Sequence, residues 1–223
     1  EVCDGTELGV ASCLDYGYDR GWLGCTTGCT PGFEGCYHDG WRSVQSPASS
    51  YLFGVWGSGP DDIFAVGSLG TIVHYDGSAW TGMTSGPTDT LWDVWGSGPT
   101  DVYAVGVPTG PLHYDGTSWS MQLTGTGVIH YGVWGSGPTD IYIVGEGGTI
   151  QHYDGATWNA VATTTTEKLV AVWGSSASDV FVVGEEGTVL HKQGSVWSET
   201  PVGSWPGFMA VGGEWFLMWQ SEV

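Results

Sequence analysis

Basic residues are the scarcest charged class in this sequence. Its 223 residues include four Lys and Arg against 24 Asp and Glu, which gives a formal net charge of −20. Nucleic acids and anionic lipid surfaces are bound through clusters of Lys and Arg, so we expect neither as a partner. Two interpretations of the acidity stay open: it keeps an extracellular protein soluble, or it attracts a divalent cation or a cationic partner.

Long hydrophobic runs are also missing. A helix that spans a membrane needs about 20 consecutive apolar residues, and no such stretch occurs. We therefore expect no membrane insertion. The chain begins at Glu1 and not at Met, which indicates a mature form or an excised segment.

Catalytic motifs are a third absence. The sequence has no His-Glu-x-x-His, no Gly-x-Ser-x-Gly and no glycine-rich phosphate loop that ends in Lys. Those motifs hold a catalytic metal, a nucleophilic serine or a nucleotide. The His and Asp residues that could react recur four times at a fixed spacing, which favours architecture over a single active site. We predict a protein that is not an enzyme and has no cofactor, with calcium as the one ion to consider.

Cysteine is confined to the start of the chain. Five occur: Cys3, Cys13, Cys25, Cys29 and Cys36. Dense cysteine in a short segment indicates disulfides and an oxidising compartment, so we expect residues 1–36 to be a disulfide-stapled arm of a secreted or cell-surface protein. Five thiols allow at most two internal disulfides. Short spacings favour pairing among the last four, which leaves Cys3 for an intermolecular bond; a partner cysteine upstream in a longer precursor is the alternative.

A 39-residue repeat dominates the rest of the chain. The segment LFGVWGSGPDDIFAVGSLGTIVHYDGSAW, which begins at Leu52, returns three times with small changes. Three marker positions recur at intervals of 39 residues: a first Trp, a His and a last Trp. They are Trp56, Trp95, Trp134 and Trp173; His74, His113, His152 and His191; and Trp80, Trp119, Trp158 and Trp197. Self-similarity at this period indicates a repeat architecture.

Each copy is predicted to contain three to four short antiparallel strands. The apolar run LFGVWG ends at a Ser-Gly-Pro turn that no helix tolerates. Ile63–Val66 is rich in β-formers, and Thr71–Tyr75 alternates before Asp76-Gly77, which is a hairpin signal. No window shows the 3.6-residue period of a helix. This number of strands in each repeat matches one blade of a β-propeller.

The two ends of the chain continue the repeat in part. The Trp80 series extended back by 39 residues reaches Trp41, in a His-Asp-Gly-Trp sequence that copies the hairpin end of a blade. The Val172 series extended forward reaches Val211, in a run that starts a further blade and is followed by a second apolar run. The C-terminus therefore supplies inner strands, and residues near 33–47 supply outer strands.

We predict an all-β fold, a five-bladed β-propeller over residues 37–223. It has four whole blades plus one composite blade closed by both termini. Sharing a blade in this way seals the ring, because neither end is left as a free edge strand.

The repeat resembles two known patterns. The run from Ala65-Val66-Gly67 to Tyr75-Asp76 and Trp80 resembles the Kelch-type blade, although it is shorter and lacks a regular Gly-Gly doublet. The pattern VWGSGPxDVYAVG…GTIxHYDGxxW looks more closely like repeats in secreted proteins of myxobacteria and their relatives, and the cysteine-rich start resembles a motif of the same surface proteins. The resemblance implies a propeller fold and secretion, and it implies no activity.

The repeated His and Asp residues are predicted to be structural. Equivalent positions on successive blades lie around a ring, too far apart for four His residues to share one ion. We expect instead that His74 bonds to Asp62 within its blade. Asp62, Asp101, Asp140 and Asp179 follow a turn, where Asp commonly accepts nearby backbone N–H bonds. Calcium binding by these four carboxylates is the alternative.

Two classes of function stay open. The first is an extracellular structural or adhesive module that contacts further copies of itself, as an oligomer or filament, or other surface proteins. The alternative is a multivalent lectin-like propeller, in which Trp80, Trp119, Trp158 and Trp197 stack on sugar rings and do not merely seal a hairpin. The stretches after these tryptophans differ between repeats, whereas repeated ligand sites would keep similar loops, so we favour the first class.

Overall fold

The computed structural model describes residues 44–108 and 110–199, together with the backbone of four further strands. The chain divides into two compact units, Glu1–Gln45 and Ser46–Val223; the predicted boundary after residue 36 falls within the first. Across the described ranges, no helix is long and apolar enough to span a membrane.

The first unit contains one antiparallel hairpin, β1 (Arg20–Cys25) and β2 (Pro31–Tyr37). Cys25 pairs with Pro31 in the register, and Cys36 pairs with Gly21 at the other end of the hairpin. Five residues of β2 separate the two positions, which is roughly 16 Å of extended chain. The side chains of all five cysteines lie outside the described residues, and the predicted disulfides among Cys13, Cys25, Cys29 and Cys36 stay a prediction.

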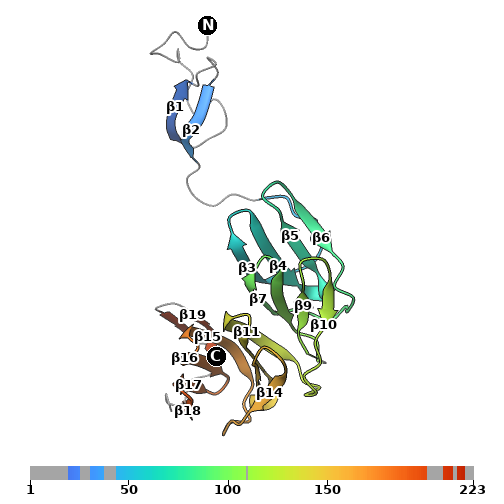
Figure 1. Ribbon diagram of the computed structural model, residues 1–223, viewed down its shortest axis with the longest axis vertical. Coiled ribbons are helices and arrows are strands. Elements are labelled where there is room, and N and C mark those ends of the chain that lie inside the picture. The colour runs from blue at the N-terminus through green and yellow to red at the C-terminus, as the bar shows by residue number, and fades with distance from the viewer. Residues whose placement is uncertain are drawn as a thin grey trace, which may run out of the picture. The chain divides into compact units, whose positions relative to one another are not determined.

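The second unit is built from four four-stranded antiparallel sheets, in which each strand pairs with the next along the chain (Figure 1). Each sheet covers one copy of the repeat and is called blade 1 to blade 4 in chain order. Blade 1 is β3 (Leu52–Gly59), β4 (Asp62–Gly67), β5 (Ile72–Tyr75) and β6 (Trp80–Met83); blade 2 is β7 (Asp93–Gly98), β8 (Asp101–Val105), β9 (Leu112–Tyr114) and β10 (Trp119–Met121); blade 3 is β11 (His130–Gly137), β12 (Asp140–Gly145), β13 (Ile150–Tyr153) and β14 (Trp158–Val161); blade 4 is β15 (Leu169–Ser176), β16 (Asp179–Gly184), β17 (Val189–Gln193) and β18 (Val196–Glu199). The predicted strands are confirmed, and the weak stretch after the last Trp is the outer strand.

Blades pack face to face through a contact between tryptophan and glycine. The first strands of successive blades contact one another, and the indole of Trp56 lies so close to Gly96 of blade 2 that an added Cβ would come within 2.6 Å of Trp56 Cη2. Trp95 meets Gly135 at 2.6 Å in the same way, and blades 3 and 4 repeat the contact. Only glycine leaves room for the indole of the preceding blade, so the repeated Trp and the glycine that follows it act as a pair.

A two-stranded sheet continues the series beyond blade 4. Its strands are β19 (Phe208–Gly212) and β20 (Trp215–Met218), and β19 contacts β15 and β16. The register places Gly212 opposite Trp215, at the positions where blade 4 pairs Trp173 with Phe181. The predicted inner strands of a further blade are therefore present. The outer strands predicted near residues 33–47 are wrong at both ends of that range, because residues 33–37 belong to β2 and pair with β1, and residues 44–47 form no strand. Residues 38–43 lie outside the described residues, so the count of five blades stays a prediction.

Blade 1 has an open face. Val55 is 69% exposed, whereas its equivalent Val94 is 4% exposed, and the equivalents in blades 3 and 4 are also buried. Leu52 is exposed too, while Leu91 is buried. The nearest atoms to a Cβ built at Gly57 belong to blade 1 itself, and no indole from the described residues occupies the place that Trp56 takes beside Gly96. The side chains of this face match those that a preceding blade covers elsewhere in the fold.

Candidate functional site

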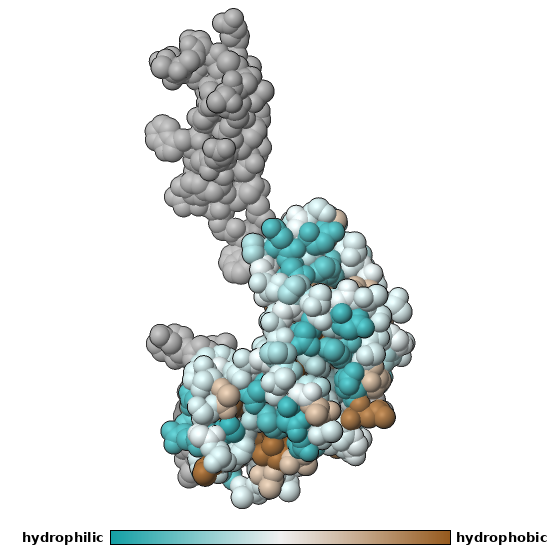
Figure 2. Space-filling view, viewed as in Figure 1, coloured by the Kyte–Doolittle hydropathy of each residue, from teal (hydrophilic) through white to brown (hydrophobic). Residues whose placement is uncertain are grey.

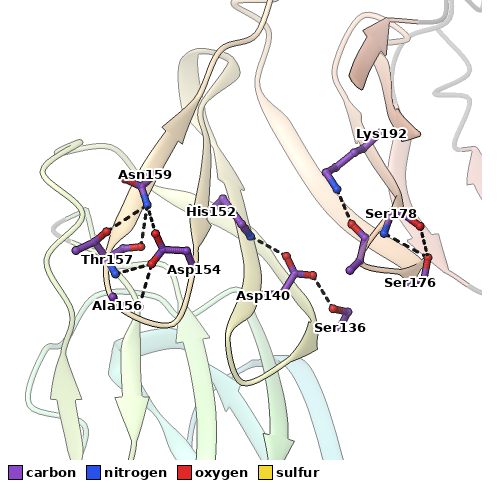
Figure 3. Close-up of polar contacts among 11 residues, drawn as sticks. Ser136, Asp140, His152, Asp154, Ala156, Thr157, Asn159, Ser176, Ser178 and Lys192 are labelled. Carbon is purple, nitrogen blue, oxygen red and sulfur yellow. Dashed lines mark hydrogen bonds and ion pairs between the residues drawn. The ribbon is translucent and has the colours of Figure 1, made fainter. Parts of the chain in front are cut away.

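Each blade contains the same network of three side chains. In blade 3, Ser136 Oγ donates to Asp140 Oδ2 at 2.6 Å, and His152 Nε2 lies 2.7 Å from Asp140 Oδ1 (Figure 3). The predicted bond between His74 and Asp62 is confirmed at 2.6 Å. Blades 2 and 4 repeat the network with Ser97, Asp101 and His113 and with Ser175, Asp179 and His191.

The order of the three groups is that of a structural network. A serine nucleophile is activated when the His lies between Ser and Asp and takes the hydroxyl proton. Here the carboxylate lies between the other two groups, so the hydroxyl donates to Asp and not to His. The His ring also stacks on an aromatic residue of the neighbouring strand, as His152 does on Tyr142 with centroids 4.4 Å apart. The network therefore ties the Ser-Gly-Pro turn to the third strand of its blade.

A second aspartate series caps the hairpin turns. Asp62 and its equivalents bind the side chains just described, whereas Asp76 Oδ1 accepts the backbone N–H groups of Ser78 and Ala79 at 2.9 Å each. The side-chain bond from Ser78, followed by the backbone bonds from Ala79 and Ser78, lowers the pKa of Asp76 to about 2. Backbone capping, which the sequence suggested for the Asp62 series, thus belongs to Asp76 and its equivalents Asp115 and Asp154.

Calcium binding stays a prediction. Both oxygens of Asp62 are engaged by Ser58 and His74. Where side chains are described, no group of three or more His, Cys, Asp or Glu is arranged to hold a metal ion. The candidate ligands are Asp62, Asp101, Asp140 and Asp179.

The last tryptophan of blades 2, 3 and 4 packs against the preceding blade, whereas that of blade 1 packs within its own hairpin. Trp119 of blade 2 meets Phe64 of blade 1 edge-on, with centroids 6.1 Å apart, and Trp158 meets Tyr103 at 6.3 Å. Trp80 lies against Tyr75 in its own hairpin at 5.5 Å. These contacts assign Trp119 and Trp158 a packing role, and sugar stacking on the series of Trp80, Trp119, Trp158 and Trp197 stays a prediction.

A continuous row of aromatic rings crosses the starts of three inner strands. Phe53, Trp92 and Tyr131, here called the aromatic row, lie one on each of blades 1 to 3. Their ring centroids are 4.9 Å apart from Phe53 to Trp92 and 5.7 Å apart from Trp92 to Tyr131. Trp92 is 37% exposed although it has a blade on either side. On the face shown in Figure 2 most of the surface is pale, with several hydrophilic areas in teal, and the strongly hydrophobic residues in brown lie in small separate patches.

β-bulges hold two of the three rings, whereas Trp92 directly precedes β7. The register shifts between Leu52 and Gly54 and again between His130 and Gly132, so Phe53 and Tyr131 are the extra residues of their strands. A bulge residue is released from the alternation of the strand, which re-aims its side chain. Val170 holds this position in blade 4, and the register of β19 places Met209 there. The position is therefore apolar in every copy.

Sequence reasoning missed the aromatic row because it treated each LFGVWG-type run as a regular strand. One signal was available: Phe53, Trp92 and Tyr131 are spaced by 39 residues and are always aromatic, yet the identity of the ring changes. Positions that build the frame, such as the first Trp, keep one residue type.

Two polar residues interrupt the apolar packing between blades 2 and 3. His130 is fully buried at the position of Leu91 and Leu169, and among the described residues neither of its ring nitrogens has a hydrogen-bond partner. Burial lowers the pKa of His130 to about 4. Asp93 lies at the position that Gly54 holds in blade 1 and Gly132 in blade 3. Its carboxylate accepts the backbone N–H of Val133 at 3.0 Å, across the interface between blades 2 and 3. Desolvation raises the pKa of Asp93 to about 6, against the opposing effect of its backbone bonds.

Comparisons with known proteins bear on the fold. No protein-family model matches the sequence, and no curated protein matches it. The solved structures of similar fold include YCF48 from Cyanidioschyzon merolae, at 20% identity and a TM-score of 0.61, covering 78% of this chain and 63% of that one. YCF48 bound to D1 peptide matches at 13% identity and a TM-score of 0.53, and the match covers 70% of this chain and 55% of that one. The computationally designed Ika4 protein matches at 14% identity and a TM-score of 0.55, and the match covers 70% of this chain and 99% of that one. The chain thus has a β-propeller fold and spans less than two thirds of the YCF48 chains.

Replacing His113 with Ala should destabilise the protein without loss of a metal. The change removes the bond to Asp101 and the stacking on Tyr103, and we expect the free energy of unfolding to fall by about 1 to 2 kcal/mol. Urea denaturation and elemental analysis of the purified protein measure the two quantities. Stoichiometric metal that disappears in the variant would show that the His series binds an ion.

Replacing His130 with Leu should remove a loss of stability in acid. The pKa of His130 in the folded state, about 4, lies below the unfolded value of 6.5, so its contribution is complete above pH 6.5 and is lost as pH falls toward 4. We expect about 3 kcal/mol of the acid-induced loss to be absent from His130→Leu. Asp93 acts in the opposite direction and is common to both proteins, so the difference between their urea curves at pH 7 and pH 4 isolates His130. Equal losses in the two proteins would contradict the buried, neutral imidazole.

Proposed function

We propose that this chain is an extracellular, non-catalytic propeller that serves as a rigid module for contacts with other proteins, and that the aromatic row is its contact surface. The supporting observation is the continuity of three aromatic rings on three adjacent blades. Phe53 and Trp92 are exposed, and Tyr131 is half-buried. Trp, Tyr and Phe are enriched in protein interfaces, because each buries a large area with little side-chain entropy to lose. The His–Asp–Ser networks support the frame on which the rings are held.

An extracellular location is the compartment that suits the arm and the charge. Five cysteines in 36 residues favour an oxidising environment. One similar structure is a YCF48 bound to a peptide, and a propeller that binds a polypeptide is the role we propose here. A structural or adhesive role at a cell surface follows if Cys3 links the arm to a neighbouring chain, as in an oligomer or filament.

We further propose that a composite fifth blade closes the ring. β19 and β20 supply its inner strands, and the stretch around Trp41 supplies an outer strand. The open face of blade 1 supports this, because exposed Leu52 and Val55 occupy positions that are covered by a preceding blade in the other repeats. Covering them removes apolar surface from water and leaves no free edge.

Replacing Trp41 with Ala tests the closure. If Trp41 is the last tryptophan of the composite blade, its loss should destabilise the propeller by about 2 to 4 kcal/mol, like the loss of a large core side chain. Trp119→Ala is the positive control, and Trp22→Ala, in strand β1, is the control for the arm. A propeller whose thermal unfolding is unchanged by Trp41→Ala but lowered by Trp119→Ala would contradict the composite blade.

The aromatic row can be tested with a photoreactive side chain. A benzophenone amino acid at position 92 should cross-link to a polypeptide in extracellular material, because Trp92 lies at the centre of the proposed surface. The same probe at Leu123 or Val196, exposed residues on the outer side of their blades, is the matched control. Equal cross-linking from all three positions would contradict a specific surface.

Carbohydrate binding is the second candidate, because exposed Trp and Tyr rings also stack on sugars. A glycan array with and without calcium separates the candidates. Saturable glycan binding that is lost in Trp92→Ala would show that the aromatic row binds sugars. Glycan binding that is lost in Trp80→Ala or Trp197→Ala would place the sugar sites at the last tryptophans of the repeats.

A further inference from the structure

The surface around the aromatic row differs in character between its two ends. At the blade 1 end, Tyr51 and Leu69 flank Phe53, and both are largely exposed. Ser68 donates its backbone N–H to the carbonyl of Tyr51 at 2.9 Å, which holds Leu69 beside Tyr51. We call Tyr51, Phe53 and Leu69 the apolar end.

At the opposite end the neighbours are acidic. Tyr131 donates its hydroxyl to Glu146 Oε1 at 3.2 Å, and Glu185 forms an ion pair with Lys168. Lys168 Nζ lies 5.4 Å from the centroid of the Tyr131 ring. Glu186 follows Glu185 and is exposed. Three carboxylates and one ammonium leave a net negative charge here; Glu146, Glu185 and Glu186 are called the acidic end.

Two residues that characterise the ends adopt an unfavourable backbone conformation. Leu69 has φ 58° and Glu186 has φ 52°, and the equivalent position in blade 3 is Gly147 with φ 62°. A residue with a Cβ in this left-handed region costs about 1 kcal/mol relative to glycine. Blade 3 shows that glycine fits the turn, so blades 1 and 4 keep a leucine and a glutamate there despite the cost.

The row is long enough for an extended chain to lie along it. Side chains on one side of an extended polypeptide repeat at roughly 6.6 Å, which is about 1 to 2 Å longer than the steps of 4.9 Å and 5.7 Å between the rings. Alternate side chains of an extended segment can therefore contact the row without matching its rings one to one. An arginine that reaches Tyr131 can stack on the ring and pair with Glu146.

We infer that this surface binds an extended segment of another protein, with apolar side chains on the apolar end and an arginine or lysine at the acidic end. The inference rests on the proposed function and adds the chemical class of the partner. Charge complementarity excludes a second copy as the preferred occupant, because the chain has four Lys and Arg in all and a net charge of −20. A basic chain is attracted by the same charge that repels a second copy.

Two short labelled peptides test the inference by fluorescence anisotropy. One joins leucines to a pair of arginines, and the other is identical except that citrulline, a neutral analogue of similar shape, replaces arginine. We expect the arginine peptide to bind the full-length protein about tenfold more tightly at low salt, a difference of about 1.4 kcal/mol, and the gap to close as salt is raised.

Matched variants separate the two contributions. Glu185→Gln with Glu186→Gln should reduce the preference for arginine, while Asp61→Asn, in the turn at the opposite end of β3, should leave it unchanged. Trp92→Ala should weaken both peptides. If both peptides bind equally and the binding of both depends on Trp92, the predicted preference for a basic side chain is wrong, but the proposal that the aromatic row binds proteins is supported. If neither peptide shows binding that depends on Trp92, the extended-chain partner is wrong, and the cross-linking experiment decides the row independently.

Discussion

Between each pair of blades an indole ring lies against a glycine, and the other features of the propeller depend on this contact. The indole of Trp56 fills the space over Gly96, so the two first strands approach closely enough for Val94 of blade 2 to be buried between the sheets. Because the Trp and the Gly lie at consecutive positions of the repeat, each blade offers an indole to the next blade and a glycine to the preceding one. Successive blades therefore stack head to tail.

Most of the frame could be predicted from the sequence, because the frame is what the repeat keeps constant. The turn chemistry after the first Trp, the Asp-Gly hairpin and the invariant His each mark a local structure, and the His74–Asp62 bond followed from the need to satisfy a buried imidazole. The role of Asp62 was predicted less well. A turn position suggests backbone capping, but the choice between backbone and side-chain partners depends on how close β5 comes to the turn, which the sequence does not encode locally.

The aromatic row could not be predicted in the same way, because it depends on strand register. An alternating pattern assigns Phe53 to one face or the other of a regular strand, and only the bulge releases it from both. Similarly, the composition of the core gives no hint that His130 replaces leucine without a partner, or that Asp93 bonds across an interface to Val133. These positions depart from the repeat, and their surroundings come from the neighbouring blade.

The bulge has an evolutionary consequence. Its side chain takes no part in the pairing of its own strand, and the Trp–Gly contact and the His–Asp–Ser network are made by other residues. Selection can therefore change the ring at this position in one blade without disturbing the strand pairing, the Trp–Gly contact or the turn of that blade. Exchange or duplication of a whole blade would change the exposed row by one side chain at a time. A family of such propellers could therefore change the partners that it recognises while the packing of the blades stays the same.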